Sequence, residues 1–496
     1  MSQGRPATGW AVKIALVAGF LWGTPAAIAD QFHYHNIIVG DRALGLGGAY
    51  GAVSDDASGI YYNPAGMAFA LNNDISGSAN TYFNRTVTYK ETVFDEDFVE
   101  ESGSQVPSFF GGLQKLDKYV KGLVAGFATW TTDSDLKDQD DLIRNKVEGN
   151  IDIRRFHRTV NQRASTSYAG VGAGYRVLPN LGVGFGLAYF SVDELVQEYQ
   201  DTIQSVDGGS IYTLLNQNIR QHLSAAGIQP ILGIQYAIGG VLSMGLTVKP
   251  GVILTETLAF DSERRISAFS GSQLETLEAG EREASLATLQ SIQERQESED
   301  ALGGWPLETR LSFAWFASTR LLWTLDLTYH AAVSNAGSFQ PFEVCRNSDD
   351  QVISCSDPSS VGTIENKLYE REAVLNYATG LEYYVIPSLP LRLGIFTNFD
   401  ARPEVDEATP DDATAAQTTK RSCSYADFYT KYCNQPDHID YYGGSVFAAY
   451  VTPQSQISVG FIVQSGSGKA QKKGGHEVQD VEALATTFAF SATHNL

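Results

Sequence analysis

Lys249 and Arg310 are the two side chains in this sequence that are best suited to bind a carboxylate ligand. An arginine offers two parallel hydrogen bonds to a carboxylate, and a lysine offers a point charge. Both belong to a set of charged residues on the inner faces of predicted strands, with Glu308, Asp326, His330, Glu382 and Arg392. These charges are expected to pair with one another, so a ligand carboxylate requires one cation that stays unpaired.

The sequence contains no motif that predicts catalysis, a metal site or a nucleotide site. It has no G-x-S-x-G sequence, and its eight histidines are scattered, with only His33 and His35 close together. Gly45 and Gly47 match the start of a dinucleotide fingerprint, but Tyr50 stands where the third glycine belongs. The chain is therefore expected to be neither an enzyme nor a protein with a metal or cofactor.

The four cysteines form two local pairs along the chain, Cys345 with Cys355 and Cys423 with Cys433. Neither pair has the C-x-x-C spacing that a zinc site usually shows. The spacing therefore favours two loop disulfides over zinc. Structural disulfides are typical of exported proteins.

The N-terminal residues indicate the cellular compartment of the protein, and its net charge argues against some classes of partner. Residues 1–29 combine Lys13, an apolar run over 14–22 and the small residues Ala27 and Ala29, which predicts a secretory signal peptide. An uncleaved anchor is the alternative, but the run is shorter than the ~20 residues that a spanning helix needs. The net charge of −22 argues against nucleic acid and against an electrostatic grip on anionic lipid.

Apolar and polar residues alternate in many segments of about ten residues, the length and pattern of a strand that crosses an outer membrane. In 320–330, for example, Leu321 and Trp323 share one face and Thr324 and Asp326 the other. Such segments lie near 75–90, 106–113, 121–131, 165–177, 181–197, 228–238, 241–258, 306–317, 320–332, 372–385, 389–400, 440–451, 455–465 and 481–496. The sequence therefore predicts an all-β fold, a transmembrane antiparallel β-barrel of about 14 strands.

The connections between these segments alternate in length. Tight turns fall at 178–180, 239–240, 318–319, 386–388 and 452–454, and every intervening connection is long. Short periplasmic turns and long outer loops are typical of outer-membrane barrels. The chain is therefore expected in the outer membrane of a Gram-negative bacterium, as a monomer among lipid and lipopolysaccharide. Residues 91–101 and 133–141 are predicted as acidic outer loops, either a solvated face or a site for divalent ions that bridge to lipopolysaccharide.

The segment before the first predicted strand resembles a known family. Residues 41–50 have the sequence DRALGLGGAY, and residues 55–68 have the sequence DDASGIYYNPAGMA. This pattern resembles the N-terminal hatch of the FadL/TodX family of outer-membrane transporters for long-chain fatty acids and hydrocarbons. By that resemblance, residues 30–74 form a hatch that plugs the lumen of a barrel over 75–496. The hatch is then expected to include Gly47, Gly48, Asp55, Asp56, Asn63, Pro64 and Ala65.

The resemblance implies passive transport of hydrophobic small molecules. A fatty acid, alkane or aromatic ligand is captured between outer loops, enters the barrel and leaves sideways through a gap in the wall, with the hatch as its gate. In the family the gap lies at a kink in an early strand, here near Gly122 or Gly126. Pro250 is an alternative position, because proline interrupts a ladder. A barrel of type IX secretion has a similar hatch motif, so a protein-binding or secretion accessory is the alternative function.

Two further features bear on where a ligand binds. Alternation places a wall of small residues on the inner faces of two neighbouring strands, which gives room to the hatch or to a ligand tail: Gly170, Gly172, Gly174, Gly182, Gly184, Gly186 and Ala188. Residues 210–227 and 272–292 show apolar residues at helical spacing. Leu214, Leu215 and Ile219 in the first of these helices are expected to form an entrance groove for the ligand, or else to pack on the second helix as a lid.

Overall fold

The computed structural model describes residues 32–93, 96–148, 151–205, 211–270, 287–299, 301–334, 338–339, 343–346, 352–353, 364–365, 369–405, 437–471 and 478–496. The predicted signal peptide lies outside these residues, as do Cys355, Cys423 and Cys433, and Cys345 is described only by its backbone. The signal peptide and the two disulfides therefore stay predictions. Within the described part of the chain, no helix is both long enough and apolar enough to span a membrane.

Fourteen antiparallel strands form a closed barrel, in which the last strand pairs with the first. Two of them run in two pieces: the seventh consists of β7 and β8, and the eighth of β9 and β10. The strands of the ring are β1 Asp74–Val93, β2 Glu96–Lys115, β3 Leu123–Glu148, β4 Ile151–Leu178, β5 Leu181–Ser205, β6 Ile211–Ile238, β7 Leu242–Lys249, β8 Val252–Ser270, β9 Ala287–Ser298, β10 Glu308–Ser318, β11 Leu321–His330, β16 Val374–Ile386, β17 Leu389–Asn398, β18 His438–Val451, β19 Ser455–Ala470 and β20 Gln479–Asn495. The predicted fold is confirmed.

Shorter elements lie outside the ring of strands. Four short strands follow β11 along the chain: β12 Ser338–Phe339, β13 Glu343–Arg346, β14 Val352–Ile353 and β15 Ile364–Glu365. Of these, β13 pairs with β9, and so extends the sheet. Three helical turns precede β1: α2 Asp41–Gly45, α3 Gly59–Tyr62 and η2 Gly66–Phe69.

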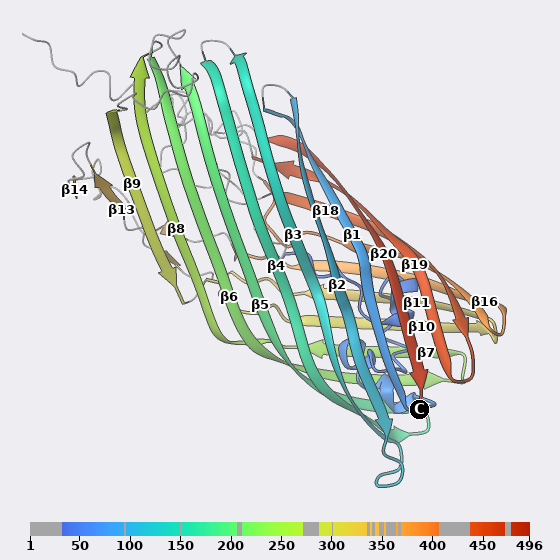
Figure 1. The fold of residues 1–496 in the computed structure, drawn as a ribbon. Coiled ribbons are helices and arrows are strands. Elements are labelled where there is room, and N and C mark those ends of the chain that lie inside the picture. The colour runs from blue at the N-terminus through green and yellow to red at the C-terminus, as the bar shows by residue number, and fades with distance from the viewer. Residues whose placement is uncertain are drawn as a thin grey trace, which may run out of the picture.

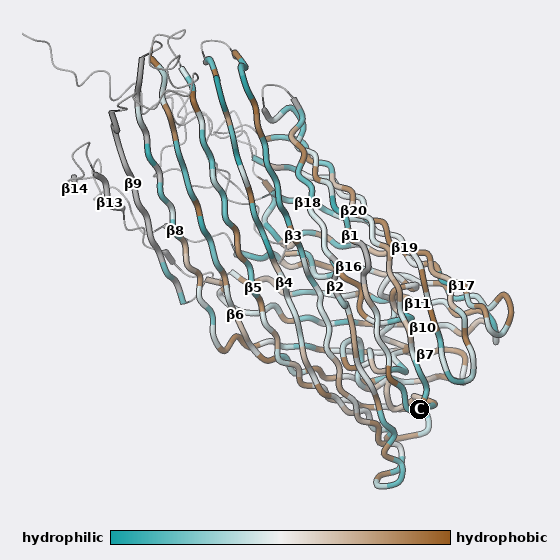
Figure 2. The backbone as a smooth tube through the Cα atoms, in the orientation of Figure 1, coloured by the Kyte–Doolittle hydropathy of each residue, from teal (hydrophilic) through white to brown (hydrophobic). Residues whose placement is uncertain are grey.

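Successive side chains of each strand point alternately out of the barrel and into its lumen. In β5, Val183, Phe185 and Tyr189 are exposed on the outer face, while Ala188 and Phe190 are buried on the inner face. Figure 2 shows that apolar residues are frequent over the lower part of the barrel, whereas the upper parts of β3–β6 are largely hydrophilic. A closed ladder with an apolar outer band suits a bilayer, because lipid offers no hydrogen bonds to unpaired backbone. The protein is an outer-membrane β-barrel.

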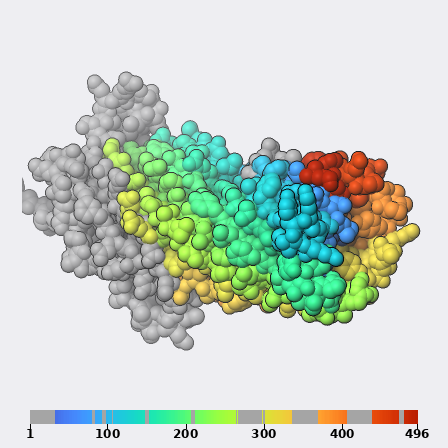
Figure 3. Space-filling view, turned by 90° about the horizontal axis from the view of Figure 1, so that it is seen from below, coloured from blue at the N-terminus to red at the C-terminus, as the bar shows by residue number. Residues whose placement is uncertain are grey.

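The barrel is much taller on one side than on the other (Figure 1). The tall side contains β3, β4, β5 and β6, with 26, 28, 25 and 28 residues. The short side contains β10, β11, β16 and β17, with 11, 10, 13 and 10 residues. In the space-filling view the green strands run along much of the molecule, whereas the orange and red strands occupy one end (Figure 3).

The tall strands extend beyond the membrane on one side only. A tilted strand needs only about 9–11 residues to cross a bilayer. The tight turns lie together at one end of the barrel, which we name the turn end, so the extra length of the tall strands lies at the opposite end, which we name the loop end. In outer-membrane barrels the turn end is periplasmic.

The two acidic segments predicted as outer loops are largely parts of strands. Residues 96–101 belong to β2, and residues 133–141 belong to β3. Asp133 and Asp135 are buried on the inner face, where Asp135 forms an ion pair with Arg85. The prediction was wrong because apolar and polar residues cease to alternate where a strand leaves the membrane and both of its faces become polar. Part of the negative charge therefore lies inside the barrel.

The helix predicted over 210–227 is also a strand, since β6 begins at Ile211 and continues to Ile238. Leu215, Ile219 and Leu223 face the lumen and are buried, whereas Leu214 lies on the outer face and is partly exposed. Residues four apart share a face of a helix, but they also share a face of a strand. The apolar spacing was therefore compatible with both structures.

The second predicted helix, over 272–292, is wrong at its C-terminal end. Residues 287–292 form the first part of β9. The rest of that predicted helix lies outside the described residues. Neither the groove nor the lid of two packed helices is therefore formed.

Candidate functional site

Residues 32–73, which we name the N-terminal segment, lie inside the barrel near its turn end (Figure 1). The Asp41 carboxylate accepts hydrogen bonds from Ser458 Oγ and Ser491 Oγ, both at 2.6 Å. Gln456 Nε2 donates to the same carboxylate at 2.7 Å, and Thr493 Oγ1 at 3.1 Å. Burying a carboxylate without such donors would cost on the order of several kcal/mol. Asp41 thus anchors the segment to β19 and β20.

Further contacts anchor the N-terminal segment elsewhere around the ring. The Asp326 carboxylate of β11 accepts hydrogen bonds from the backbone N–H groups of Tyr50 at 3.1 Å and Gly51 at 3.0 Å. Arg42 binds Glu382 of β16 through Nε at 3.0 Å and Nη2 at 2.7 Å. The segment is therefore bound to several strands of the ring.

The residues expected to belong to a hatch lie in tight turns of this segment. Gly47 and Gly48 have φ values of 64° and 86°, which side chains larger than glycine rarely adopt. The Asp56 carboxylate accepts hydrogen bonds from Ser58, at N (2.8 Å) and at Oγ (2.5 Å), and Asp55 accepts one from Tyr50 Oη at 2.9 Å.

Asn63 links the same segment to the tall side. Its Nδ2 donates to Gly51 O at 2.9 Å and to Ile234 O of β6 at 3.2 Å. Its Oδ1 accepts a hydrogen bond from Ala65 N at 3.1 Å. Pro64 and Ala65 then lie directly against the barrel wall.

The inner glycines of β4 and β5 make room for the N-terminal segment. A Cβ atom on Gly184 would overlap the backbone of Pro64 and Ala65, and a Cβ on Gly174 would meet Pro64 O at 2.5 Å. On the short side, a Cβ on Gly394 would overlap the backbone of Gly47. Of the two roles open to the glycine wall, contact with the N-terminal segment is the one that these distances support.

Lys249 and Arg310, the two predicted carboxylate binders, are buried and ion-paired. Lys249 Nζ lies 2.8 Å from Glu308 Oε1, and Arg310 Nη2 lies 3.2 Å from the same oxygen. Each cation also lies over an aromatic ring, Lys249 at 3.9 Å from the Tyr61 centroid and Arg310 at 4.9 Å from that of Tyr62. Neither lines a described pocket, and a role of either in binding a ligand stays a prediction. Among the described residues, no cluster of His, Cys, Asp or Glu is arranged to hold a metal ion.

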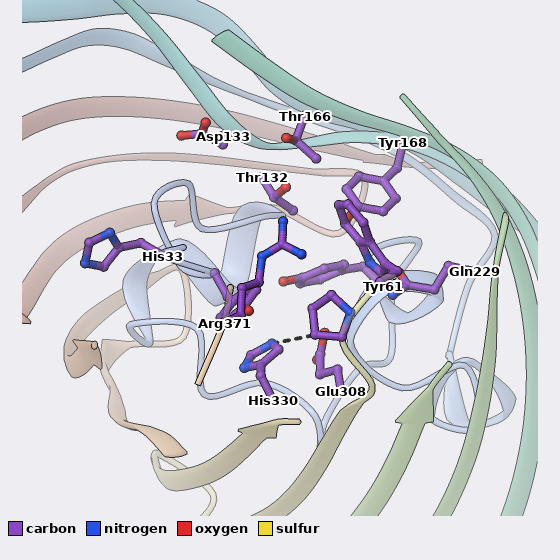
Figure 4. Close-up of a pocket in the computed structure, with 13 residues that line it drawn as sticks. His33, Tyr61, Thr132, Asp133, Thr166, Tyr168, Gln229, Glu308, His330 and Arg371 are labelled. Atoms are coloured by element: carbon purple, nitrogen blue, oxygen red, sulfur yellow. Dashed lines mark ion pairs between the residues drawn. The ribbon is translucent and has the colours of Figure 1, made fainter. Parts of the chain in front are cut away.

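A pocket that is partly open to solvent lies in the lumen beside the N-terminal segment, with a cavity volume of about 50 Å³. Figure 4 shows side chains that converge on it from several strands and from the N-terminal segment. Its apolar part includes Tyr61, Tyr168 and Trp305, and its polar part includes Glu308 and His330. A concave site with apolar walls and a few polar groups is typical of small-molecule binding.

Five aromatic rings form a row along the apolar part of this pocket. Trp305 stacks on Phe190, with 4.2 Å between the ring centroids, and Phe190 lies 6.0 Å from Tyr168. Tyr168 stacks on Trp130 at 5.2 Å, and Trp130 lies 5.8 Å from Tyr61. Offset and tilted arrangements at these distances are attractive. Three members of the row, Trp305, Tyr168 and Tyr61, line the pocket, while Phe190 and Trp130 are buried behind them.

The polar part of the pocket is built around His330. The Tyr34 ring stacks on the imidazole at 3.8 Å, and His330 Nε2 lies 3.7 Å from Glu308 Oε2. Among the described residues, neither Tyr34 Oη nor His330 Nδ1 has a hydrogen-bond partner, although both atoms are buried. Burial raises the pKa of Tyr34 and of Tyr61 to about 12, so both hydroxyls stay protonated at neutral pH.

The wall of the barrel is interrupted beside the pocket, between β2 and β3. The ladder pairs Gly103 with Leu136 and then resumes with Phe109 and Trp130, with no pairs between them. Thr132 and Asp133, which line the pocket, lie on β3 at this interruption. The N-terminal segment binds β3 here: Ile37 N donates to Thr132 O at 3.1 Å and Asn36 Nδ2 to Asp133 Oδ1 at 3.0 Å.

This interruption lies further along β3 than the predicted positions. Gly126 pairs with Leu113 in the regular part of the ladder, and Gly122 precedes the strand with a φ of 80°. Neither glycine lies at the break.

A second interruption lies at Pro250, as the sequence predicted. In the ladder between the seventh and the eighth strand, Lys249 pairs with Glu308. The next pair in this ladder is Leu258 with Ser298. Residues 301–307 turn inward at this height, where Leu302 is buried and Trp305 joins the aromatic row. A Cβ atom on Gly251 would overlap the Trp305 ring, so the glycine after the proline gives room to the indole.

Several pocket residues were not identified from the sequence. Trp130 and Tyr168 lie on the inner faces of their strands, and Tyr168 has the parity of Gly170 and Gly172, so the alternation contained a signal for it. Tyr34 and Trp305 lie in irregular backbone, where the alternation of strand residues gives no signal.

Comparison with solved structures identifies the architecture. A Pseudomonas aeruginosa FadL homologue matches with a TM-score of 0.55 and 12% identity, over 93% of this chain and 99% of that chain. The P. putida toluene transporter TodX matches with a TM-score of 0.52 and 12% identity, over 92% of this chain and 97% of that chain. The chain has the FadL/TodX fold. No family model and no curated protein matches the sequence, and identities this low show the fold alone.

Proposed function

We propose that this FadL-like barrel is a passive channel for hydrophobic small molecules in the outer membrane. The observation that carries the proposal is the aromatic pocket, which lies inside the barrel and borders an interruption of its wall at Thr132 and Asp133. A hydrophobic ligand gains free energy when it leaves water for such a site, at roughly 25 cal/mol per Å² of apolar surface buried. No energy source is required, because the ligand moves from water to lipid.

The N-terminal segment would direct the ligand sideways. It fills the lumen between the pocket and the turn end, so a straight path to the periplasm is closed unless the segment moves. The interruption between β2 and β3 offers a lateral path instead. Apolar side chains are exposed on the outer face on both sides of it, Phe110 and Phe127 towards the turn end and Val99 and Leu136 towards the loop end. A ligand that leaves here meets lipid.

We further propose that the N-terminal segment acts as a gate for this path. Asn36 and Ile37 bind Asp133 and Thr132 at the interruption, so a shift of the segment would break these two hydrogen bonds and change the width of the gap. Capture by outer loops would precede this step. Most of the residues between β11 and β16 and between β17 and β18 lie outside the described part of the chain.

Chemical closure of the gap tests the proposal. Cells that express the Thr132→Cys variant are treated with a bulky thiol reagent, and the uptake of radiolabelled toluene is measured. We expect uptake to fall at least about tenfold, because the adduct fills both the pocket wall and the gap. The treated Gln454→Cys variant, with its cysteine in an exposed turn, and the treated wild type should keep full uptake. Unchanged uptake in the labelled Thr132→Cys variant would exclude this path.

A further inference from the structure

The polar part of the pocket contains two buried atoms that a ligand could bind. Tyr34 Oη and His330 Nδ1 have no hydrogen-bond partner among the described residues, and both side chains line the pocket. His330 Nε2 faces Glu308 Oε2 at 3.7 Å, so its proton belongs on Nε2, which leaves Nδ1 as an acceptor. Tyr34 Oη–H is a donor. One hydroxyl group could satisfy both, by donating to Nδ1 and accepting from Oη.

The charges that line the pocket favour a neutral guest. Asp133 and Glu308 line it with carboxylates, whereas the only cation of the lining is Arg371, apart from the histidines. The Arg371 guanidinium lies over two rings, 5.6 Å from the Phe32 centroid and 5.9 Å from that of Trp305. Glu308 is itself paired with Lys249 and Arg310, and Arg371 donates to Gly304 O. A carboxylate ligand would therefore lose its hydration where each of these cations already has a partner, which is unfavourable.

The shape of the apolar part favours a flat guest. Trp305, Tyr168 and Tyr61 line the pocket with aromatic rings, and stacking on such rings is worth about 0.5–1.5 kcal/mol per ring pair beyond the area buried. An alkyl chain gains the burial but not the stacking.

We propose that the pocket selects planar aromatic compounds that have a neutral hydroxyl group, with the ring in the aromatic row and the hydroxyl between Tyr34 and His330. Phenols fit this description, because a phenolic hydroxyl titrates near pH 10 and is neutral at pH 7. The inference rests on the proposed channel function and names the class of compound that the channel carries.

Equilibrium dialysis of radiolabelled ligands against the full-length barrel in detergent tests the inference, with protein-free micelles as the blank. The probes are p-cresol, toluene and p-toluate, which share a ring and a methyl group. We expect p-cresol to bind about tenfold tighter than toluene, and p-toluate to bind more weakly than p-cresol, because a site built for a hydrogen bond disfavours analogues that lack it. Equal affinity for p-cresol and toluene, or tighter binding of p-toluate, would overturn the inference while leaving a hydrophobic channel intact.

The Tyr34→Phe variant tests the assigned contact. It keeps the ring that stacks on His330 and removes only the hydroxyl, so p-cresol should bind about five- to tenfold more weakly while toluene is unaffected. The control is Tyr329→Phe, the same change on the exposed outer face of β11. Equal losses for both ligands in Tyr34→Phe would also overturn the inference. If the wild-type barrel retains none of the three probes, the proposed function itself fails.

Discussion

The tall and the short sides of the barrel meet the same membrane with very different strands. β17, on the short side, has 10 residues, about the length needed to cross, whereas β4, on the tall side, has 28. The excess lies at the loop end, where the strands are largely hydrophilic (Figure 2). The difference shows that two demands act on the tall strands: their turn-end halves must suit lipid, and their loop-end halves form a wall that stands in water.

A charge on the outer face should distinguish these halves most clearly. In β5, Phe185→Arg should destabilise the barrel by about 2–4 kcal/mol, because it places a cation in the hydrocarbon. Leu393→Arg, on the short side, should cost a similar amount. Tyr199→Arg, on the same outer face of β5 but further towards the loop end, should cost less than about 0.5 kcal/mol. Denaturant titration in lipid vesicles measures all three variants, whose native residues are exposed.

This result would fix where the membrane ends on the tall side. A cost for Tyr199→Arg as large as that for Phe185→Arg would place both residues in lipid. The loop-end halves of the tall strands would then not stand in water.

The anchors of the N-terminal segment on β19 and β20 differ from those on the tall side, which leads to a second prediction. Asp41→Ala removes a charged acceptor of four donors on β19 and β20, and should cost about 2–3 kcal/mol. Asn63→Ala removes neutral hydrogen bonds to Gly51 and Ile234 and should cost about 1 kcal/mol. Hydrogen exchange of residues 40–51 would report the loosening, and so would ion conductance in planar bilayers.

Asp480→Ala provides the control for this pair of variants. It breaks an exposed ion pair with Lys469, and exposed pairs contribute only about 0–1 kcal/mol. Conductance and exchange should match the wild type. If Asp41→Ala behaves like Asp480→Ala, the carboxylate does not hold the segment in place.

A third prediction concerns the inner glycines of the two sides. Gly184→Ala on the tall side and Gly394→Ala on the short side should each cost about 1–3 kcal/mol, because the added methyl groups overlap backbone of the N-terminal segment. Gly186→Ala is the matched control in β5, since its methyl group would meet Ile231 at 3.4 Å and Val171 O at 3.6 Å, both ordinary contact distances. Thermal unfolding followed by gel mobility would rank the three. Equal stability of Gly184→Ala and Gly186→Ala would mean that the segment can move away at little cost.

The sequence predicts the short side and the membrane-spanning halves of the tall strands well. Alternation is strong wherever one face meets lipid, as at Phe185 and Leu393. It is lost in the loop-end halves, which is why residues 133–141 were predicted as a loop and Leu215 and Ile219 as parts of a helix. Hydrogen bonds to neighbouring strands decide these segments, and no local pattern encodes them.

The residues of the pocket, too, could be predicted from the sequence only in part. Tyr168 could be identified from its parity with Gly170, and the interruption at Pro250 from the proline itself. Trp305 reaches the aromatic row through an inward turn, and Tyr34 lies in the N-terminal segment. Both positions depend on contacts between residues far apart in the sequence, so neither could be predicted from local pattern.

The partners of Asp41 also constrain the order in which the barrel is built. They lie 415 to 452 residues further along the chain, on the last two strands. The ring closes only when β20 pairs with β1, the strand that directly follows the N-terminal segment in the sequence. The N-terminal segment must therefore wait for the last hairpin before it can settle. It must already be within the ring at closure, since threading it through a finished wall would require breaking a ladder.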